Sequence, residues 1–369
     1  MSYTIPLSYN PPDPETLDTV LCDYAGKHHN ELIRDFEAAL SNYTRAPHVL
    51  ALNSGTAAIH LGLIALGVGA GDEVLVPDFT YVASVNPVLY LGARPVFVDS
   101  EPETWGMDPE LLEKAIRKRI DAGVSPKAIV VVHVYGMPAR IEEIVSIGDR
   151  YGIPVLEDAA EALGSRVGDQ HVGLHGRLGV ISFNNNKILT TYGGGAIITR
   201  DEALYRRALF LSEQAREDAP WYDHREVGYT YRMGPLNAAV GLAQFPRLGD
   251  YVARRRATFE QYRLLLKQGF TFVKERAGVT SNRWLTTVVL DEKVDVAAVV
   301  RGMKEEGIEC RHLWRPMHDQ GVFAQHESYQ AEVAARLFRC GLSLPSGNML
   351  KEEDAEVVAS QLGRFVAGT

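Results

Sequence analysis

Short, uninterrupted runs of apolar residues alternate with helical patterns along the first half of this chain. A strand buried on both faces carries such a continuous run, whereas a strand with one wet face alternates apolar and polar residues. Strand–helix alternation of this kind favours a mostly parallel sheet with right-handed crossovers. We therefore predict an α/β fold with helices on both faces of a mostly parallel central sheet. The predicted strands are 49–53, 73–76, 94–98, 128–134 and 155–157, and the predicted helices are 54–66, 81–91, 109–121 and 141–151.

The pattern changes after residue 202, where helical spacing dominates and predicts helices at 233–245 and 248–267. We place a boundary near Gly249, which gives a large domain at 1–248 and a smaller α+β domain at 249–369. The proline-rich first residues are expected to form an extended arm ahead of a helix at 30–44. The small domain is expected to hold strands at 285–290 and 309–313 and helices at 294–305, 329–340 and 352–365.

The composition argues against several classes of protein. The 369 residues carry a formal net charge of −9, so there is no basic surplus to neutralise the phosphates of a nucleic acid. No apolar run approaches the length of a membrane span, and the first residues lack the basic and apolar regions of a signal peptide. The three cysteines are too few and too scattered for a disulfide framework, a zinc site or an iron–sulfur cluster. We expect a cytoplasmic protein that binds no metal, nucleic acid or membrane.

Four features fall at the carboxyl ends of predicted strands, where ligands bind in such sheets. Ser54–Ala57 is a glycine turn that runs into a helix, which suits a phosphate or serves only as a helix cap. Tyr81 could lie beneath an aromatic ring or pack in the core. Asp158 could keep a pyridine nitrogen protonated or cap the next turn. The fourth feature is the loop that contains Lys187, with Ser182 close before it as a second phosphate donor.

Lys187 stands in a polar loop between two strand-like apolar runs, and three glycines follow it at 193–195. Burial disfavours the charged ammonium, and a neutral amine can form a Schiff base with an aldehyde cofactor. The alternative is a lysine that points to water from an ordinary hairpin. A phosphate cradle, an aromatic ring, a carboxylate and an amine are together the parts that pyridoxal 5'-phosphate needs, because its protonated ring acts as an electron sink.

Seven segments, taken in order, carry a resemblance to a known family. They are NSGTAAIHLGL (53–63), PDFTYVAS (77–84), EDAAEALGS (157–165), SFNNNKILTTYGGG (182–195), YRMGPLNAAVGLAQ (231–244), RHLWRPMH (311–318) and GLSLPSG (341–347). Through them nearly the whole chain resembles the sugar aminotransferases of the DegT/DnrJ/EryC1/StrS family, a branch of the fold-type I pyridoxal phosphate enzymes with the aspartate aminotransferase-like fold. The SFNNNK, RPMH and GLSLPSG parts of these segments look most like those of members that aminate C4 of a nucleotide-linked 4-keto-6-deoxy sugar.

This resemblance implies roles for the site residues. Lys187 would bond the cofactor and move the proton between cofactor and substrate, Asp158 would pair with the pyridine nitrogen, and Tyr81 would stack on the ring. Glu161 stands where the family often has His or Gln, near the cofactor's hydroxyl. Thr230 replaces an asparagine that often reaches the cofactor phosphate of a neighbouring subunit. The remaining expected cofactor contacts are Gly55, Thr56, Ala57, Ser182 and Asn186, and the expected substrate contacts are Arg311, Arg315 and His318.

The resemblance also implies an activity and an assembly. L-glutamate would give its amino group to pyridoxal 5'-phosphate, and the aminated cofactor would then aminate a keto-deoxy sugar on a nucleoside diphosphate, for amino-sugar and glycan biosynthesis. The family is dimeric, with active sites shared across the interface.

Three other readings predict features that this sequence lacks. A sugar dehydrase that uses the pyridoxamine form has a histidine in place of Lys187. A nicotinamide-dependent oxidoreductase has a G-x-G-x-x-G turn after its first strand. A non-catalytic regulator that binds the same cofactor needs a DNA-binding region, for which the chain has neither spare length nor basic charge.

Overall fold

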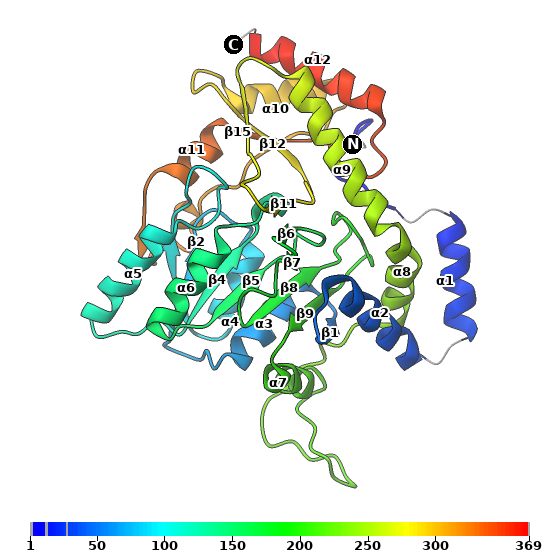
Figure 1. Ribbon diagram of the computed structural model, residues 1–369, viewed down its shortest axis with the longest axis vertical. Coiled ribbons are helices and arrows are strands. Elements are labelled where there is room, and N and C mark those ends of the chain that lie inside the picture. Colours follow the sequence, from blue (N-terminus) through cyan, green and yellow to red (C-terminus); the bar gives the residue numbers. More distant parts are fainter. Residues whose placement is uncertain (1–2, 12–13, 27–28, 368–369) are drawn as a thin grey trace.

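The large sheet has eight strands in the order β1-β9-β8-β5-β4-β2-β3-β14 (Figure 1). The computed structural model describes residues 3–11, 14–26 and 29–367. All neighbours in the sheet are parallel except β9, which is antiparallel to both β1 and β8. The strands are β1 (His48–Leu52), β2 (Glu73–Pro77), β3 (Arg94–Val98), β4 (Ala128–Val132), β5 (Val155–Asp158), β8 (Leu178–Ser182), β9 (Gly195–Thr199) and β14 (Ser328–Tyr329).

Helices cover both faces of this sheet, as the continuous apolar runs predict. Val76 of β2 belongs to the apolar cluster that includes Leu61 of α3, whereas its neighbour Leu75 packs in the cluster that includes Leu112 of α5. Successive side chains of a strand point to opposite faces, so both faces of β2 are buried. The predicted α/β fold is confirmed. The covering helices are α3 (Gly55–Ala65), α4 (Asn86–Tyr90), α5 (Pro109–Asp121), α6 (Ile141–Tyr151) and α7 (Glu202–Ser212).

The first residues differ from the prediction. An arm at residues 3–11 is followed by the helix α1 (Pro14–Gly26), where we expected extended chain up to residue 30. Proline at the first helical position loses no hydrogen bond, so the prolines there start a helix instead of preventing one. Helices α1 and α2 (His29–Thr44) pack against α8 (Pro235–Gln244), and residues 27 and 28 between them lie outside the described residues.

The C-terminal part is built on a four-stranded antiparallel sheet in the order β10-β12-β15-β13 (Figure 1). A third, small sheet joins β6 (Arg166–Val167) and β7 (Gln170–His171) to β11 (Val279–Thr280). The remaining elements are α9 (Leu248–Leu265), β10 (Phe270–Phe272), β12 (Thr286–Leu290), α10 (Val296–Glu305), β13 (Arg311–His312), α11 (Val333–Cys340), β15 (Gly341–Leu344) and α12 (Glu352–Ala367).

Two segments cross between the predicted domains. The predicted helix at 329–340 is wrong at its start, because Tyr329 lies in β14 and pairs with Val98 of the large sheet. Glu332, with a φ of 65°, turns the chain before the helix begins at Val333. At the other end of the chain, Ile5 of the arm pairs with Ile308 of the C-terminal part. The division at 248 and 249 stays a prediction.

Candidate active site

One cavity of about 510 Å³ lies where the carboxyl ends of β2, β4, β5 and β8 meet. This is the edge at which the parallel strands of such a sheet bind ligands. A second cavity of about 560 Å³, between residues 102–105, β10 and α11, contains none of the predicted site residues. The predicted residues that line the first cavity are Gly55, Thr56, Tyr81, Asp158, Glu161, Ser182, Asn186, Lys187 and Arg311.

The start of helix α3 forms one wall of the cavity. Ser54 caps this helix, and its hydroxyl accepts a hydrogen bond from the backbone N–H of Ala57 at 3.0 Å. The cap therefore uses the amide of Ala57, which does not line the cavity. A Cβ at Gly55 would come within 3.1 Å of the Ser182 Cβ, so only glycine lets the turn lie this close to β8. The amides at the helix start and the Ser182 hydroxyl are suited to an anion.

Asp158 ends strand β5 and is almost fully buried. Its Oδ2 accepts a hydrogen bond from the Ser84 hydroxyl at 2.7 Å, and its Oδ1 accepts one from the Ala160 N–H at 3.0 Å. Both donors fix the carboxylate at the cavity wall. A carboxylate held in this way can pair with a cationic ring nitrogen.

Glu157, the preceding residue, serves the fold. Burial by itself raises the pKa of this carboxyl, but hydrogen bonds from the His133 ring at 2.9 Å and from the amides of Gly173, His175 and Gly176 hold the pKa below its usual value. The carboxylate thereby anchors residues 173–176 against the end of the sheet.

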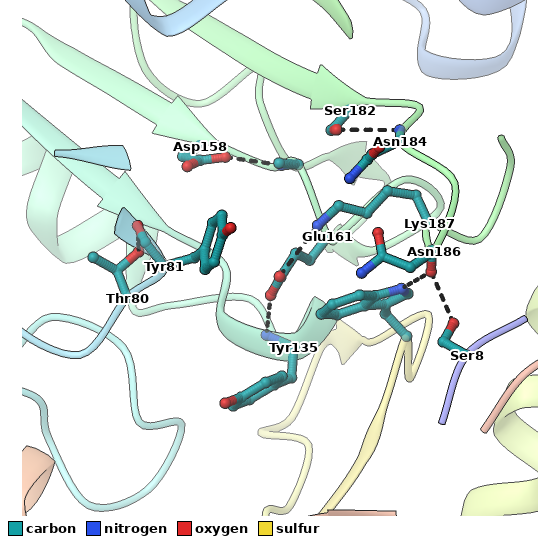
Figure 2. Close-up of polar contacts among 12 residues, drawn as sticks. Ser8, Thr80, Tyr81, Tyr135, Asp158, Glu161, Ser182, Asn184, Asn186 and Lys187 are labelled. Atoms are coloured by element: carbon teal, nitrogen blue, oxygen red, sulfur yellow. Dashed lines mark hydrogen bonds and ion pairs between the residues drawn. The ribbon is translucent and has the colours of Figure 1, made fainter. Parts of the chain in front are cut away.

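Lys187 points into the cavity toward Glu161, as Figure 2 shows, and its Nζ lies 3.2 Å from the Glu161 Oε1. The Glu161 Oε2 accepts a hydrogen bond from the Tyr135 N–H at 2.8 Å. Burial raises the pKa of the Glu161 carboxyl to about 7, although the nearby lysine opposes this. From the sequence we expected burial alone to act on the amine. The structure adds a carboxyl partner within hydrogen-bonding distance of the amine.

Aromatic side chains form the wall opposite the helix start. Tyr135 stacks on Trp314 with ring centroids 4.3 Å apart, and the Lys187 Nζ lies 4.2 Å from the centre of the Trp284 ring. Tyr81 is 58% exposed, with its ring centroid 6.5 Å from that of Trp314. Sequence reasoning singled out neither Tyr135 nor Trp284. Tyr135 follows the end of β4 and could have been found by its strand-end position, whereas nothing local marks Trp284.

Four predicted site residues do not line the cavity within this single chain: Ala57, Thr230, Arg315 and His318. The Thr230 hydroxyl accepts a hydrogen bond from the Gln214 amide at 3.0 Å. Arg315 is exposed. His318 Nδ1 lies 2.7 Å from the Oδ2 of the buried Asp78, so this histidine fixes its own loop to the end of β2.

Arg311 and Asn186 line the cavity with side chains that differ in their contacts. The Arg311 guanidinium donates to the Glu309 carboxylate at 3.0 Å and is largely exposed. The amide oxygen of Asn186 is buried and has no hydrogen-bond partner among the described residues.

The described residues contain no group of three or more His, Cys, Asp or Glu side chains placed to hold a metal ion. None of the described helices is long and apolar enough to cross a membrane.

Comparison with known proteins supports the sequence resemblance. The family model of the DegT/DnrJ/EryC1/StrS aminotransferase family matches residues 16–363. EpsN of Bacillus subtilis (strain 168) is 44% identical over 341 residues, which are 90% of this chain and 88% of EpsN. EpsN is itself only provisionally assigned as a pyridoxal phosphate-dependent aminotransferase. A GDP-perosamine synthase of Caulobacter vibrioides is 35% identical and covers 95% of this chain and 94% of its own. The crystal structure of a DegT/DnrJ/EryC1/StrS aminotransferase from Brucella abortus superposes with a TM-score of 0.88 at 28% identity, covering 95% of each chain.

Proposed function

Since this chain belongs to the DegT/DnrJ/EryC1/StrS aminotransferase family, we propose that it moves an amino group from L-glutamate to C4 of a nucleotide-linked keto-deoxy sugar. The enzyme is a pyridoxal phosphate-dependent aminotransferase of fold type I. The observation that carries the proposal is the meeting of Lys187, Asp158 and the start of helix α3 around one cavity. The perosamine synthase among its relatives supports a sugar acceptor, and the RPMH and GLSLPSG segments favour C4.

The residues that line the cavity fit pyridoxal 5'-phosphate. The amides of Gly55 and Thr56 and the Ser182 hydroxyl would hold its phosphate, Asp158 its ring nitrogen, and Tyr81 one face of its ring. The glycine at 55 and the unpartnered amide oxygen of Asn186 both belong to this cavity. When bound, the cofactor supplies a ring that accepts the electron pair of a broken C–H bond.

The protein's own residues move protons and position the reacting groups. The Lys187 Nζ takes the proton from the amino donor's α-carbon and returns it on the acceptor side. Glu161, 3.2 Å away, is the group with which this amine exchanges its proton. The aromatic wall of Tyr135, Trp284 and Trp314 keeps bulk water from that exchange.

The substrate contacts remain part of the proposal. Arg311 lines the cavity and is the candidate for the diphosphate or for the carboxylate of the amino donor. Arg315 and His318 lie outside the cavity of one chain, so their proposed contacts require a substrate that extends beyond it. Thr230 would act at the site of a neighbouring subunit in the proposed homodimer. A cytoplasmic location is favoured by the free thiols of Cys22, Cys310 and Cys340.

An absorbance spectrum tests the proposal most directly. Purified protein with pyridoxal 5'-phosphate should show a visible band that L-glutamate shifts to the pyridoxamine form, and Lys187→Ala should lack the original band. Incubation with GDP-, UDP- and dTDP-linked 4-keto-6-deoxy sugars, followed by NMR of the product, should place the new amino group on C4.

The other outcomes each contradict one part of the proposal. An amino group on C3 would overturn the position, and a band that glutamate leaves unmoved would overturn the donor. If the protein binds the cofactor but turns over no amino donor or sugar, it would instead be a non-catalytic regulator that binds the cofactor. If the sugar loses a hydroxyl group without gaining nitrogen, the protein would instead be a sugar dehydrase that uses the pyridoxamine form.

A further inference from the structure

A buried arginine without an anionic partner lies behind the Lys187 loop. Arg255 of helix α9 is 1% exposed, and every acceptor of its guanidinium is neutral. Its Nε donates to the Asn348 Oδ1 at 2.9 Å, one Nη donates to the Trp284 carbonyl, and the other donates to the Asn10 Oδ1 at 3.0 Å and the Ser8 hydroxyl at 3.3 Å. Among the described residues no carboxylate bonds to it. One side chain therefore holds together four groups from three separate parts of the chain: the N-terminal arm, Trp284 and Asn348.

The same four residues hold the backbone on both sides of the reactive lysine. Each donates a hydrogen bond from its side chain to a carbonyl of the consecutive residues 186–188. These bonds run from Ser8 and Trp284 to the Asn186 carbonyl at 2.8 and 2.9 Å, from Asn10 to the Lys187 carbonyl at 2.8 Å, and from Asn348 to the Ile188 carbonyl at 3.1 Å. Figure 2 shows the Ser8 hydroxyl reaching the backbone beside Lys187.

We propose that Arg255 is a positioning residue, which fixes the Lys187 backbone by orienting the Ser8, Asn10 and Asn348 side chains and by holding the backbone of Trp284 at its carbonyl. The inference rests on the proposed role of Lys187. It adds to the active site the N-terminal arm at residues 8–10, because Ser8 and Asn10 donate to the carbonyls of Asn186 and Lys187.

Arginine suits this position for a geometric reason. Its planar guanidinium presents five N–H donors in a fixed fork, which can satisfy acceptors in several directions at once. A lysine would present one small ammonium and could not reach Asn348, Trp284 and Asn10 together. Burial lowers the pKa of Arg255 to about 9, so the side chain still carries its charge at neutral pH.

A buried charge held only by neutral dipoles is costly unless those dipoles are aimed at it. The Asn10 and Asn348 amide oxygens both point at the guanidinium, which leaves the amide nitrogens of the same side chains to donate to the lysine loop. The guanidinium donors therefore favour the orientation in which both amide nitrogens face the loop, and for Asn10 the Asn348 N–H, which donates to the same oxygen at 2.8 Å, favours it as well. If the fork of donors were removed, the Asn348 amide could turn over and the Asn10 amide would be held less firmly, so that contacts with the loop would weaken.

Hydrogen exchange in the cofactor-free protein tests the inference without using the reaction. Two backbone amides of the loop are suitable probes: the Lys187 N–H donates to the Asn184 carbonyl at 3.0 Å, and the Thr191 N–H donates to the Phe183 carbonyl at 2.9 Å. In Arg255→Lys we expect these two amides to exchange at least about tenfold faster. Arg256→Lys is the matched control, because Arg256 lies on the same helix but bonds to Glu275 and to the Ser281 carbonyl instead.

Kinetics of the loaded enzyme give the second readout. A misplaced lysine slows the chemical step, so kcat of Arg255→Lys should fall by about 10- to 100-fold, while KM for L-glutamate changes by less than about threefold. A purely structural arginine would lower the amount of folded enzyme and leave both constants of the folded fraction unchanged.

Two results would overturn the inference: unchanged exchange of residues 184–191 in Arg255→Lys, or equal acceleration in Arg256→Lys. Should Arg255→Lys not fold, Asn10→Ala removes one link of the same network and is expected to accelerate exchange of the same two amides. Failure of the proposed transamination would leave the exchange result standing, so the two hypotheses fail separately.

Discussion

At the scale of single residues, the burial of the Glu161 carboxyl makes stability depend on pH. Glu161 has a folded-state pKa of about 7, raised by burial above the ordinary value near 4.5. A raised carboxyl pKa means that the folded protein binds the proton more tightly than the unfolded chain. Its stabilising contribution is thus present below about pH 4.5 and is lost as the pH rises through 7. We expect Glu161→Gln to remove this dependence, which amounts to roughly 3 kcal/mol over that window.

Urea unfolding of the cofactor-free protein at several pH values between about 4.5 and 8 measures this difference. The free energy of unfolding of the wild type should fall relative to that of Glu161→Gln as the pH rises. The exposed Glu110→Gln is the control and should follow the wild type. Parallel profiles for wild type and Glu161→Gln would contradict the assigned environment of the carboxyl.

Sequence reasoning could find the residues whose position along the chain is itself informative. Asp158 ends a buried strand, and Lys187 lies between two apolar runs that could be recognised as strands. The ion pair of Glu161 and the stack of Tyr135 on Trp314 depend on side-chain directions and on segments far apart in sequence. A linear pattern contains no information of that kind, so these contacts could not be predicted.

At the scale of elements, the segment at 313–319, which follows β13, is held to the end of β2 by buried polar contacts with Asp78. The Asp78 carboxylate accepts from the His318 backbone N–H at 2.9 Å and lies 2.7 Å from its ring, and the Asp78 carbonyl accepts from the Met317 N–H at 2.8 Å. Burial raises the pKa of Asp78, while the contacts with His318 oppose the rise. Trp314 of the same segment is held in the aromatic wall by its own contacts with Tyr135, to whose hydroxyl its N–H donates at 3.2 Å.

We expect His318→Ala to cost about 2 kcal/mol in the free energy of unfolding, because it leaves the Asp78 carboxyl buried without its ring partner. The double variant Asp78→Asn/His318→Ala should lose less than the two single variants together, since the buried charge goes with its partner. Denaturant unfolding of the four proteins gives these values.

Arg315→Ala is the control for this cycle, since an exposed side chain in the same loop should change stability by less than about 0.5 kcal/mol. An additive cycle would show that Asp78 and His318 act independently. If KM for the sugar rises in Arg315→Ala while stability is unchanged, the proposed substrate contact of Arg315 gains support.

Elements were predictable where local rules agree with the tertiary structure. The helices α5 and α6 and the strand β3 have the predicted bounds, because each combines a clear period with a clear start. Strand β14 is two residues long and exists only because β3 offers it an edge. Helix α1 was hidden by the proline-rich composition of the first residues, because composition alone does not show that Pro14 stands at the first position of a helix.

At the scale of the whole molecule, the segment between α7 and α8 leaves the body of the protein. Figure 1 shows it projecting beyond α7, at the end opposite to α12. It exposes large apolar side chains, with Trp221 68%, Tyr222 81% and Val227 78% exposed. Apolar groups gathered on a projecting segment favour contact with another protein surface, which in the proposed homodimer is the second copy. Thr230 lies at the base of the same segment, which pairs with Glu213.

At micromolar concentration we expect the wild type to sediment at about twice the mass of one chain. The variant Trp221→Asp should sediment closer to the mass of a single chain, because the dimer would have to bury a charge in its interface. The control is Val357→Asp on α12, a residue that is 47% exposed at the opposite end of the molecule and should leave the mass unchanged. Because the proposed dimer shares its active sites, Trp221→Asp should also bind pyridoxal 5'-phosphate more weakly, by about tenfold or more. A wild type that is monomeric and fully active would contradict both the dimer and the cross-subunit role proposed for Thr230.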